Sequence, residues 1–282
     1  MSKRSDLHYY PDGDILIIVD NTIFRAHKII LKMAAPTLLN HEQQGNEGNE
    51  LPFINIPDIS ASVMDIALSI IYPRYFIMPT WENIDSLLSL ASNYVINKIY
   101  VAGVTFLYHN FKKNPLDAFY LADKYKLSFL FEETSKLVLD HLPKYKEDPT
   151  FQKLPLEIQS ALIARHMSYV HSLAELSVNH FLSTYHHTCN NPSFHNKQLN
   201  QEIESRVLSI LDQPSNITPS KVWTIMLSHI NINVSDGTDC NSYFMSDHLT
   251  KKFNIMFGDF KYLEIDKDEE NPKYYIYISR NK

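Results

Sequence analysis

A group of histidine and cysteine side chains after residue 185 has the chemistry to bind zinc. Its members are His186, His187, Cys189, His195, Cys240 and His248. Imidazole nitrogens and thiolates are common zinc ligands, and structural zinc sites carry them at short, fixed spacings. The spacing here matches no standard zinc module, so we expect no metal. A metal-binding protein or enzyme hidden in the C-terminal region stays open as an alternative.

Histidine is a residue type that can serve as a general base, so His27 is a candidate for that role. No serine or cysteine nucleophile with an orienting acid can be paired with it from the sequence, so we interpret His27 as a packed structural histidine. The chain has six glycines, and the one close pair, Gly45 and Gly48, lies in the polar run HEQQGNEGNE. Dinucleotide fingerprints, phosphate-binding loops and nucleophile elbows need glycines at fixed short spacing. We therefore expect no enzyme, no cofactor and no small-molecule substrate.

Charge and hydropathy exclude two further classes of partner. The chain carries 26 basic and 32 acidic residues, a net charge of -6 and a pI near 6.1. Nucleic-acid-binding domains have clustered basic residues and a pI above about 9, so we expect no direct nucleic-acid binding. The longest apolar stretches, 15–19 and 63–71, fall short of the ~20 residues that cross a bilayer, so we expect no membrane partner.

Cysteine usage and the first residues bear on the cellular compartment. The chain has two cysteines, too few for a disulfide framework, and its first residues, MSKRSDLHYYPDGD, contain no apolar signal region. We expect an intracellular, reducing setting, cytoplasmic and/or nuclear.

The secondary structure predicted from the sequence begins with a β-hairpin, which would position the candidate residues near it. The run DILIIVD predicts a strand over 14–20, a turn follows at Asn21-Thr22, and 23–27 alternates before a helix that ends near Pro36. A third strand is expected at 53–56. The next helix, capped by Ser60 or Ser62, has two apolar stripes. One comprises Val63, Ile66, Ala67, Ile70 and Ile71, and the other comprises Met64, Leu68 and Tyr72.

Helical periodicity dominates the middle of the chain. Apolar spacing predicts one helical stripe from Ile84 to Ile99, a further helix over 101–107, and then helices over 116–125, 128–142 and 156 to about 185. Beyond residue 186 the composition turns to Asn, His, Ser and Gln, which indicates a boundary. The tail, FKYLEI followed by DKDEENPK and YYIYIS, predicts a β-hairpin.

The first half of this pattern resembles the BTB/POZ domain. The resemblance rests on DILIIVDNTIFRAHKIILKMAAP, on FINIPDIS, on the helix ending IIYPR, and on NIDSLLSLASNYVINKI. The positions that match the hallmark sequence pattern of the BTB/POZ family are Asp14, Phe24, His27, Lys28, Leu31 and Ala34. The match is strong over 12–112 and weaker over 114–176, where the sequence looks like fungal BTB proteins with a BACK-like helical extension. Ala35-Pro36 departs from the family's usual Ser-Pro.

The resemblance implies an α+β protein with a BTB/POZ fold, a small mixed sheet flanked by helices. We divide the chain into a BTB/POZ domain at 1–112, a helical extension at 113–186, and a smaller C-terminal α+β region of unknown fold at 187–282. The implied function is non-enzymatic protein–protein interaction, as a homodimerising scaffold or a ubiquitin-ligase substrate adaptor. A transcriptional co-regulator without its own DNA-binding domain is an alternative.

The resemblance also implies two sets of site residues. A charged pocket at a dimer interface falls on Asp14, His27 and Lys28, and pairing is physically sensible because either charge is costly to bury alone. A cullin-binding face falls on Val63, Met64 and Asp65, with Leu68 and Tyr72 continuing the stripe. Aspartate stands here where the family element has glutamate. The open alternative is that the chain's own helices cover both stripes.

Overall fold

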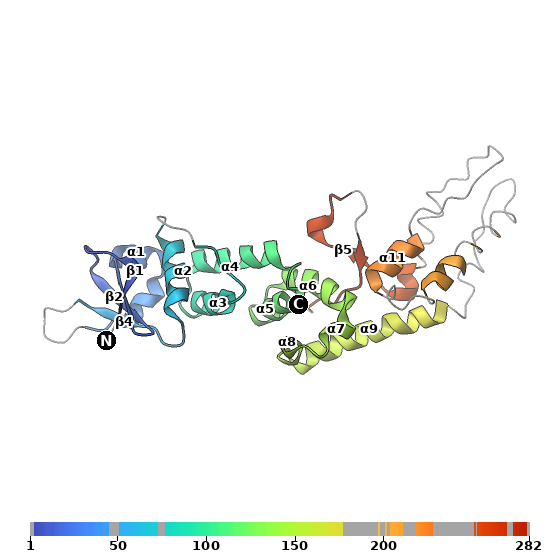
Figure 1. The fold of residues 1–282 in the computed structure, drawn as a ribbon, viewed down its shortest axis with the longest axis horizontal. Coiled ribbons are helices and arrows are strands. Elements are labelled where there is room, and N and C mark those ends of the chain that lie inside the picture. Colours follow the sequence, from blue (N-terminus) through green and yellow to red (C-terminus); the bar gives the residue numbers. More distant parts are fainter. Residues whose placement is uncertain are drawn as a thin grey trace. The chain divides into compact units, whose positions relative to one another are not determined.

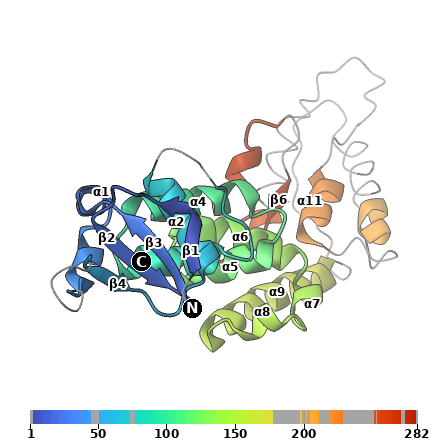
Figure 2. The same ribbon diagram turned by 60° about the vertical axis from the view of Figure 1, so that its left-hand side comes forward.

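The computed structural model of the chain describes residues 3–44, 51–72, 77–176, 197, 201, 204–210, 218–227, 251, 253–269 and 273–280 (Figures 1 and 2). The chain divides into two compact units, an N-terminal unit of residues 1–110 and a C-terminal unit of residues 111–282. The predicted boundary between extension and C-terminal region at 186–187 lies among residues outside the described ranges and stays a prediction.

A small mixed sheet forms the start of the N-terminal unit, as predicted from the sequence. Its strands are β1 (Lys3–Tyr9), β2 (Ile15–Val19), β3 (Thr22–Ala26) and β4 (Phe53–Asn55), in the order β1-β3-β2-β4. β2 and β3 form an antiparallel hairpin, and β1 and β4 each add in parallel. Asp20 and Asn21 both have positive φ, which gives the tight hairpin a backbone twist that matches its strands.

Helices complete the N-terminal unit. They are α1 (Lys28–Ala34), the 3-10 helix η1 (Pro36–His41), α2 (Ala61–Ile71), α3 (Ile84–Asn93) and α4 (Asn97–Asn110). Ser60 caps α2, because its hydroxyl oxygen accepts the N–H of Val63. The stripe predicted from Ile84 to Ile99 is broken, since Val95 adopts φ 53° between α3 and α4. Periodicity missed the break because apolar residues continue across it.

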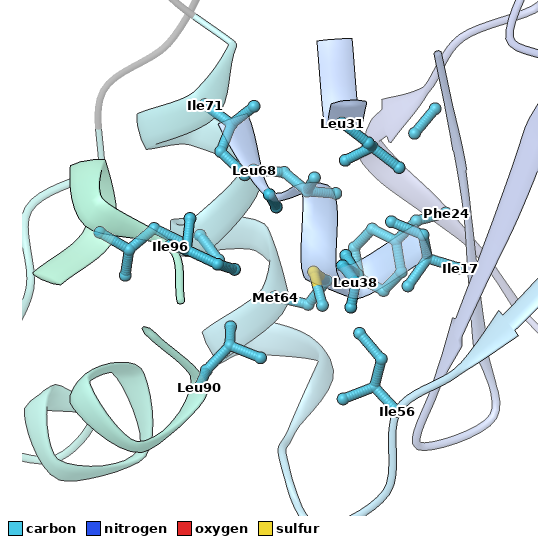
Figure 3. Packing of buried hydrophobic residues seen from close by; sticks show 14 of the residues in the cluster. Ile17, Phe24, Leu31, Leu38, Ile56, Met64, Leu68, Ile71, Leu90 and Ile96 are labelled. Carbon is cyan, nitrogen blue, oxygen red and sulfur yellow. The ribbon is translucent and has the colours of Figure 1, made fainter. Parts of the chain in front are cut away.

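The core of the N-terminal unit lies around α2. Figure 3 shows Met64 beside Leu38, with Phe24 and Ile17 beyond it, while Leu90 and Ile96 lie on another side of the helix. Six apolar residues of α2 are at most 5% exposed; they are Val63, Met64, Ile66, Ala67, Leu68 and Ile71. The sheet and the neighbouring helices therefore cover both apolar stripes.

The C-terminal unit begins with a series of helices. They are α5 (Pro115–Lys124), α6 (Ser128–Asp140), α7 (Leu142–Tyr145), α8 (Pro149–Gln152), α9 (Leu156–Leu176) and α11 (Pro219–Leu227). The two-residue strands β5 (Lys261–Tyr262) and β6 (Tyr274–Tyr275) pair antiparallel, so the predicted terminal hairpin is confirmed, and η3 (Glu264–Asp266) follows β5. Figure 2 shows β6 beside α6 and α11. Trp223 of α11 stacks on Tyr274 with ring centroids 4.3 Å apart.

Charged side chains of α6 hold the described C-terminal residues in place. Glu133 and Lys136 are almost fully buried and form an ion pair. Lys136 Nζ also donates to the carbonyl oxygen of Tyr262 at 2.7 Å, and Glu133 Oε2 accepts the N–H of Glu264 at 2.8 Å. Since each buried charge has a second polar partner after residue 260, the pair is satisfied only with that segment in place.

Gly13 is required where the chain passes closely by β3. A Cβ at this position would lie 2.6 Å from the backbone oxygen of Ala26. We expect Gly13→Ala to lower the free energy of unfolding of the N-terminal unit by about 1–3 kcal/mol, because backbone must move to relieve the overlap. Urea unfolding in a Trp223→Phe background, with Trp81 fluorescence as the probe, measures this. The exposed Lys32→Ala serves as control, and equal stability of both variants contradicts the prediction.

Candidate interaction site

Asp14 directly precedes β2, and its side chain caps the N-terminus of α1, which lies 14 residues further along the sequence. Its Oδ1 accepts the N–H of Lys28 at 2.7 Å, and α1 has no side-chain cap from His27, the residue before it. The ammonium of Lys28 binds Glu42 Oε1 at 2.8 Å instead of Asp14. Within one copy of the chain, the Asp14 carboxylate therefore binds a backbone amide and the Lys28 ammonium binds Glu42, so the two side chains do not pair there. Asp14 is exposed, and its role at a dimer interface stays a prediction.

His27 lies beside Asp14 and Lys28 but turns towards tyrosine. Its backbone N–H donates to Tyr72 Oη at 2.9 Å, its Nδ1 lies 3.3 Å from the same oxygen, and its Nε2 lies 3.3 Å from Asp12 Oδ1. Burial raises the pKa of Tyr72 to about 12, so its hydroxyl stays protonated. The partners of His27 are thus a phenol and a carboxylate, which fits the structural histidine expected from the sequence.

The predicted docking stripe on α2 is not a surface. Val63, Met64, Leu68 and Tyr72 are between 1% and 5% exposed and belong to the hydrophobic core. The docking stripe is therefore wrong for the protomer, and the open alternative holds: the chain's own elements cover these side chains. Asp65 keeps partial exposure, and its Oδ1 accepts the hydroxyl of Ser5 at 3.0 Å.

β1 was not predicted, and it carries a buried histidine. His8 Nε2 lies 3.1 Å from the carbonyl oxygen of Asp65, so Nε2–H is the donor, and Nδ1 can accept from Tyr10 Oη at 3.1 Å. Tyr10 in turn stacks on Tyr72, with ring centroids 4.7 Å apart. The inward residues of β1 are Ser5 and His8, which are polar, so the strand has no apolar alternation to reveal it.

Two large apolar side chains of α1 face solvent. Ile29 is 64% exposed and Met33 is 82% exposed, and they stand one turn apart on the same helix face. Leu31, on the opposite face, is fully buried. Asp14 and Lys28 lie at the N-terminal end of this helix. Sequence reasoning missed the pair because an apolar run in a short helix does not say which residues face outward.

The comparison with known families identifies this class of fold. A model of the BTB/POZ domain family matches residues 11–111, a range that includes the hairpin, the core around α2 and the exposed face of α1. Residues 11–111 are a BTB/POZ domain. The family is one of protein-interaction domains and not of enzymes. A search of curated proteins gave no significant match.

The structure also bears on membranes and metals, for the residues that it describes. Within them, each helix is too short or too polar to cross a bilayer. The same residues contain no group of three or more His, Cys, Asp or Glu side chains placed to hold a metal ion. The candidate ligands near His186 and the cysteines Cys189 and Cys240 lie outside the described residues.

The stability of the contact between His8 of β1 and the carbonyl oxygen of Asp65 should depend on pH. Burial lowers the pKa of His8, although the nearby Asp65 raises it in part. The unfolded chain takes up this proton near pH 6.5, so the contribution of neutral His8 is full above about pH 6.5 and is lost as the pH falls towards the lowered folded pKa. We expect the hydrogen-exchange protection factors of the β1 amides to fall over that range. His8→Gln keeps a donor and an acceptor and should remove the pH dependence; an unchanged pH dependence contradicts the assignment.

Truncation of a core side chain should lower the free energy of unfolding much more than truncation of an exposed one. Leu68→Ala removes methyl groups from a closed core and should lower the free energy of unfolding by about 2–5 kcal/mol. Met78→Ala truncates a side chain that is 61% exposed and should change it by less than about 0.5 kcal/mol. Trp81 fluorescence during urea unfolding, again in the Trp223→Phe background, measures both. If Leu68→Ala costs no more than Met78→Ala, the burial of the α2 stripe is refuted.

Proposed function

We propose that this protein is a homodimerising BTB/POZ scaffold in which the α1 faces of two copies pack against each other. The observation that carries the proposal is the solvent-exposed pair Ile29 and Met33. Large apolar patches on soluble domains mark interaction sites, and a twofold axis through α1 would bury the same patch on both copies. The exposed Asp14 and partly exposed Lys28 lie at the end of this face and would set the register of the contact.

The energies indicate that α1 anchors an interface but does not supply all of it. Burial of each large apolar side chain contributes about 1.5–3 kcal/mol, and a symmetric contact buries Ile29 and Met33 twice. Association costs about 4–15 kcal/mol in lost translational and rotational freedom. A stable interface buries roughly 1,200–2,000 Å², more than two short helix faces provide. Neighbouring surface must therefore join α1 in the dimer.

The adaptor alternative has less support. The face expected to bind a cullin runs through Met64, Leu68 and Tyr72, and these side chains fill the core. Of the predicted triplet Val63, Met64 and Asp65, only Asp65 is partly exposed. The hydroxyl of Ser5 donates a hydrogen bond to its carboxylate. An adaptor role would require a different face. The dimer proposal needs no rearrangement of the protomer, because its face is already exposed.

Light scattering of the full chain tests the dimer. We expect twice the monomer mass for the wild-type chain at micromolar concentration, and the monomer mass for Ile29→Glu/Met33→Glu. The double variant would bring four carboxylates together in an apolar contact, which should raise the dissociation constant at least about 100-fold. Circular dichroism verifies that the variant is folded.

The control is Met167→Glu on α9, because Met167 is 64% exposed but lies in the C-terminal unit. It should leave the mass unchanged. A monomeric wild-type chain, or a dimer that survives the double substitution, overturns the proposal.

A further inference from the structure

Residues 277–280 contact side chains of α5 and α6. We call these residues, Tyr277 to Arg280, the terminal segment. It follows β6 and the fully buried Ile276, and among the described residues no strand pairs with it. Tyr277, Ile278 and Arg280 are partly exposed and Ser279 is exposed. The segment is therefore held at the surface of the helices rather than within a sheet.

Ser135 of α6 binds the backbone of the terminal segment. Its hydroxyl oxygen accepts the N–H of Ile278 at 3.1 Å and lies 3.2 Å from the carbonyl oxygen of the same residue. One side chain thus contacts both polar backbone groups of a residue 143 positions away. A neighbouring β-strand usually supplies such contacts. Any extended peptide offers the same two groups, so this contact does not depend on the sequence of the segment.

Arg280 provides the sequence-specific contact. Its Nη2 donates to Asp123 Oδ1 at 2.5 Å, and its guanidinium carbon lies 5.6 Å from the ring centroid of Phe131. The Asp123 side chain is only 7% exposed, so its carboxylate needs a cation nearby. Lys126 lies 4.0 Å from it and is largely exposed, which makes it a weak substitute. The buried carboxylate of Asp123 and the ring of Phe131 thus both contact the guanidinium of Arg280.

Glu132 contacts the segment between these two points. Its Oε2 accepts the hydroxyl of Ser279 at 3.0 Å, and its Oε1 accepts from Lys261 Nζ at 2.8 Å. Burial by itself would raise the pKa of Glu132, but the hydrogen bonds from Lys261 and Ser279 hold it below its usual value. Lys261 Nζ also lies 4.3 Å from the ring centroid of Tyr277. Each residue of the terminal segment is thus contacted by a side chain of this surface.

We propose that this surface is a peptide-recognition groove, that its ligand is an extended segment of a partner protein with the pattern aromatic–hydrophobe–Ser/Thr–Arg, and that the terminal segment occupies it in the free protein. The groove is defined by Asp123, Phe131, Glu132, Ser135 and Lys261. The residues of the terminal segment are partly or fully exposed, so the segment can leave while Ile276 stays buried and Glu133 and Lys136 keep the backbone of β5 and η3 in place.

A partner peptide fits the groove better than a second copy of the chain. To reach another copy, the terminal segment would have to extend away from its own helices, and β6, which is paired with β5, would be pulled with it. A peptide from a partner needs only residues 277–280 to be displaced. Occupation by the chain's own segment lowers the apparent affinity for such a peptide by the fraction of molecules in which the groove is vacant.

Fluorescence anisotropy with a labelled peptide of sequence KYYIYISR, residues 273–280, tests the groove. The wild-type full chain is compared with full-length Arg280→Glu, in which repulsion from Asp123 vacates the groove. We expect the variant to bind the peptide at least about 10-fold more tightly than wild type. In the variant, a peptide with glutamine in place of arginine should bind at least about 10-fold more weakly, because it lacks the charge-assisted bond.

A second substitution assigns the binding to the groove. Asp123→Asn in the Arg280→Glu chain should weaken peptide binding at least about 10-fold. Glu157→Gln, at an exposed carboxylate of α9, is the matched control and should have no effect. Equal peptide binding by wild type and Arg280→Glu, or binding insensitive to Asp123→Asn, overturns the proposal.

Two further measurements test the proposal independently of the labelled peptide. The amide of Ile278 should exchange with solvent at least about 100-fold faster than the core amides of α6, since the segment must open while the helix stays folded. Exchange at the same rate as α6 shows that the segment is integral to the fold and overturns the proposal. A mass that rises with concentration, and no longer rises in Arg280→Glu, shows exchange between copies and also overturns the partner peptide.

Discussion

The N-terminal unit depends on one constraint, the burial of a helix with two apolar stripes. α2 has only Ser62, Asp65 and Ser69 as polar side chains, so most of its surface must be enclosed. The sheet and η1 lie on one side of it, and α3 and α4 lie on another (Figure 3). At about 1.5–3 kcal/mol for each large apolar side chain, its burial is a large favourable contribution. The order of strands and helices around it follows from that enclosure.

The C-terminal unit depends on a different interaction, the buried pair Glu133 and Lys136. Removing both charges from water costs several kcal/mol, which their mutual attraction only partly offsets. Their further bonds to the backbone of Tyr262 and Glu264 therefore matter for specificity more than for stability. Other positions of the segment after residue 260 would leave a buried charge without its second partner. An apolar α6 would pack with that segment less selectively.

The two units present surfaces of different chemical character. Ile29 and Met33 form an apolar face on a short helix, which suits a symmetric contact with a second copy. The surface of α5 and α6 is polar and directional, because Asp123, Glu132 and Ser135 each contact a different group of an extended chain. In the two proposals, the first surface drives association through buried area, and the second selects a peptide through hydrogen bonds and charge.

The sequence by itself determined the local elements and the fold class, because hairpin turns, helix caps and apolar stripes are encoded in neighbouring residues. The β2–β3 hairpin and the BTB/POZ pattern were predicted correctly for this reason, and of the two predicted caps, Ser60 and Ser62, Ser60 is the one formed. Only the tertiary structure decided which apolar side chains face outward and which charges pair. Met64 and Met33 look alike in the sequence, yet one fills the core and the other faces solvent. Asp14 binds an amide rather than an ammonium, and Arg280 reaches Asp123 across 157 residues. Such contacts depend on how distant elements pack, and no short-range pattern records them.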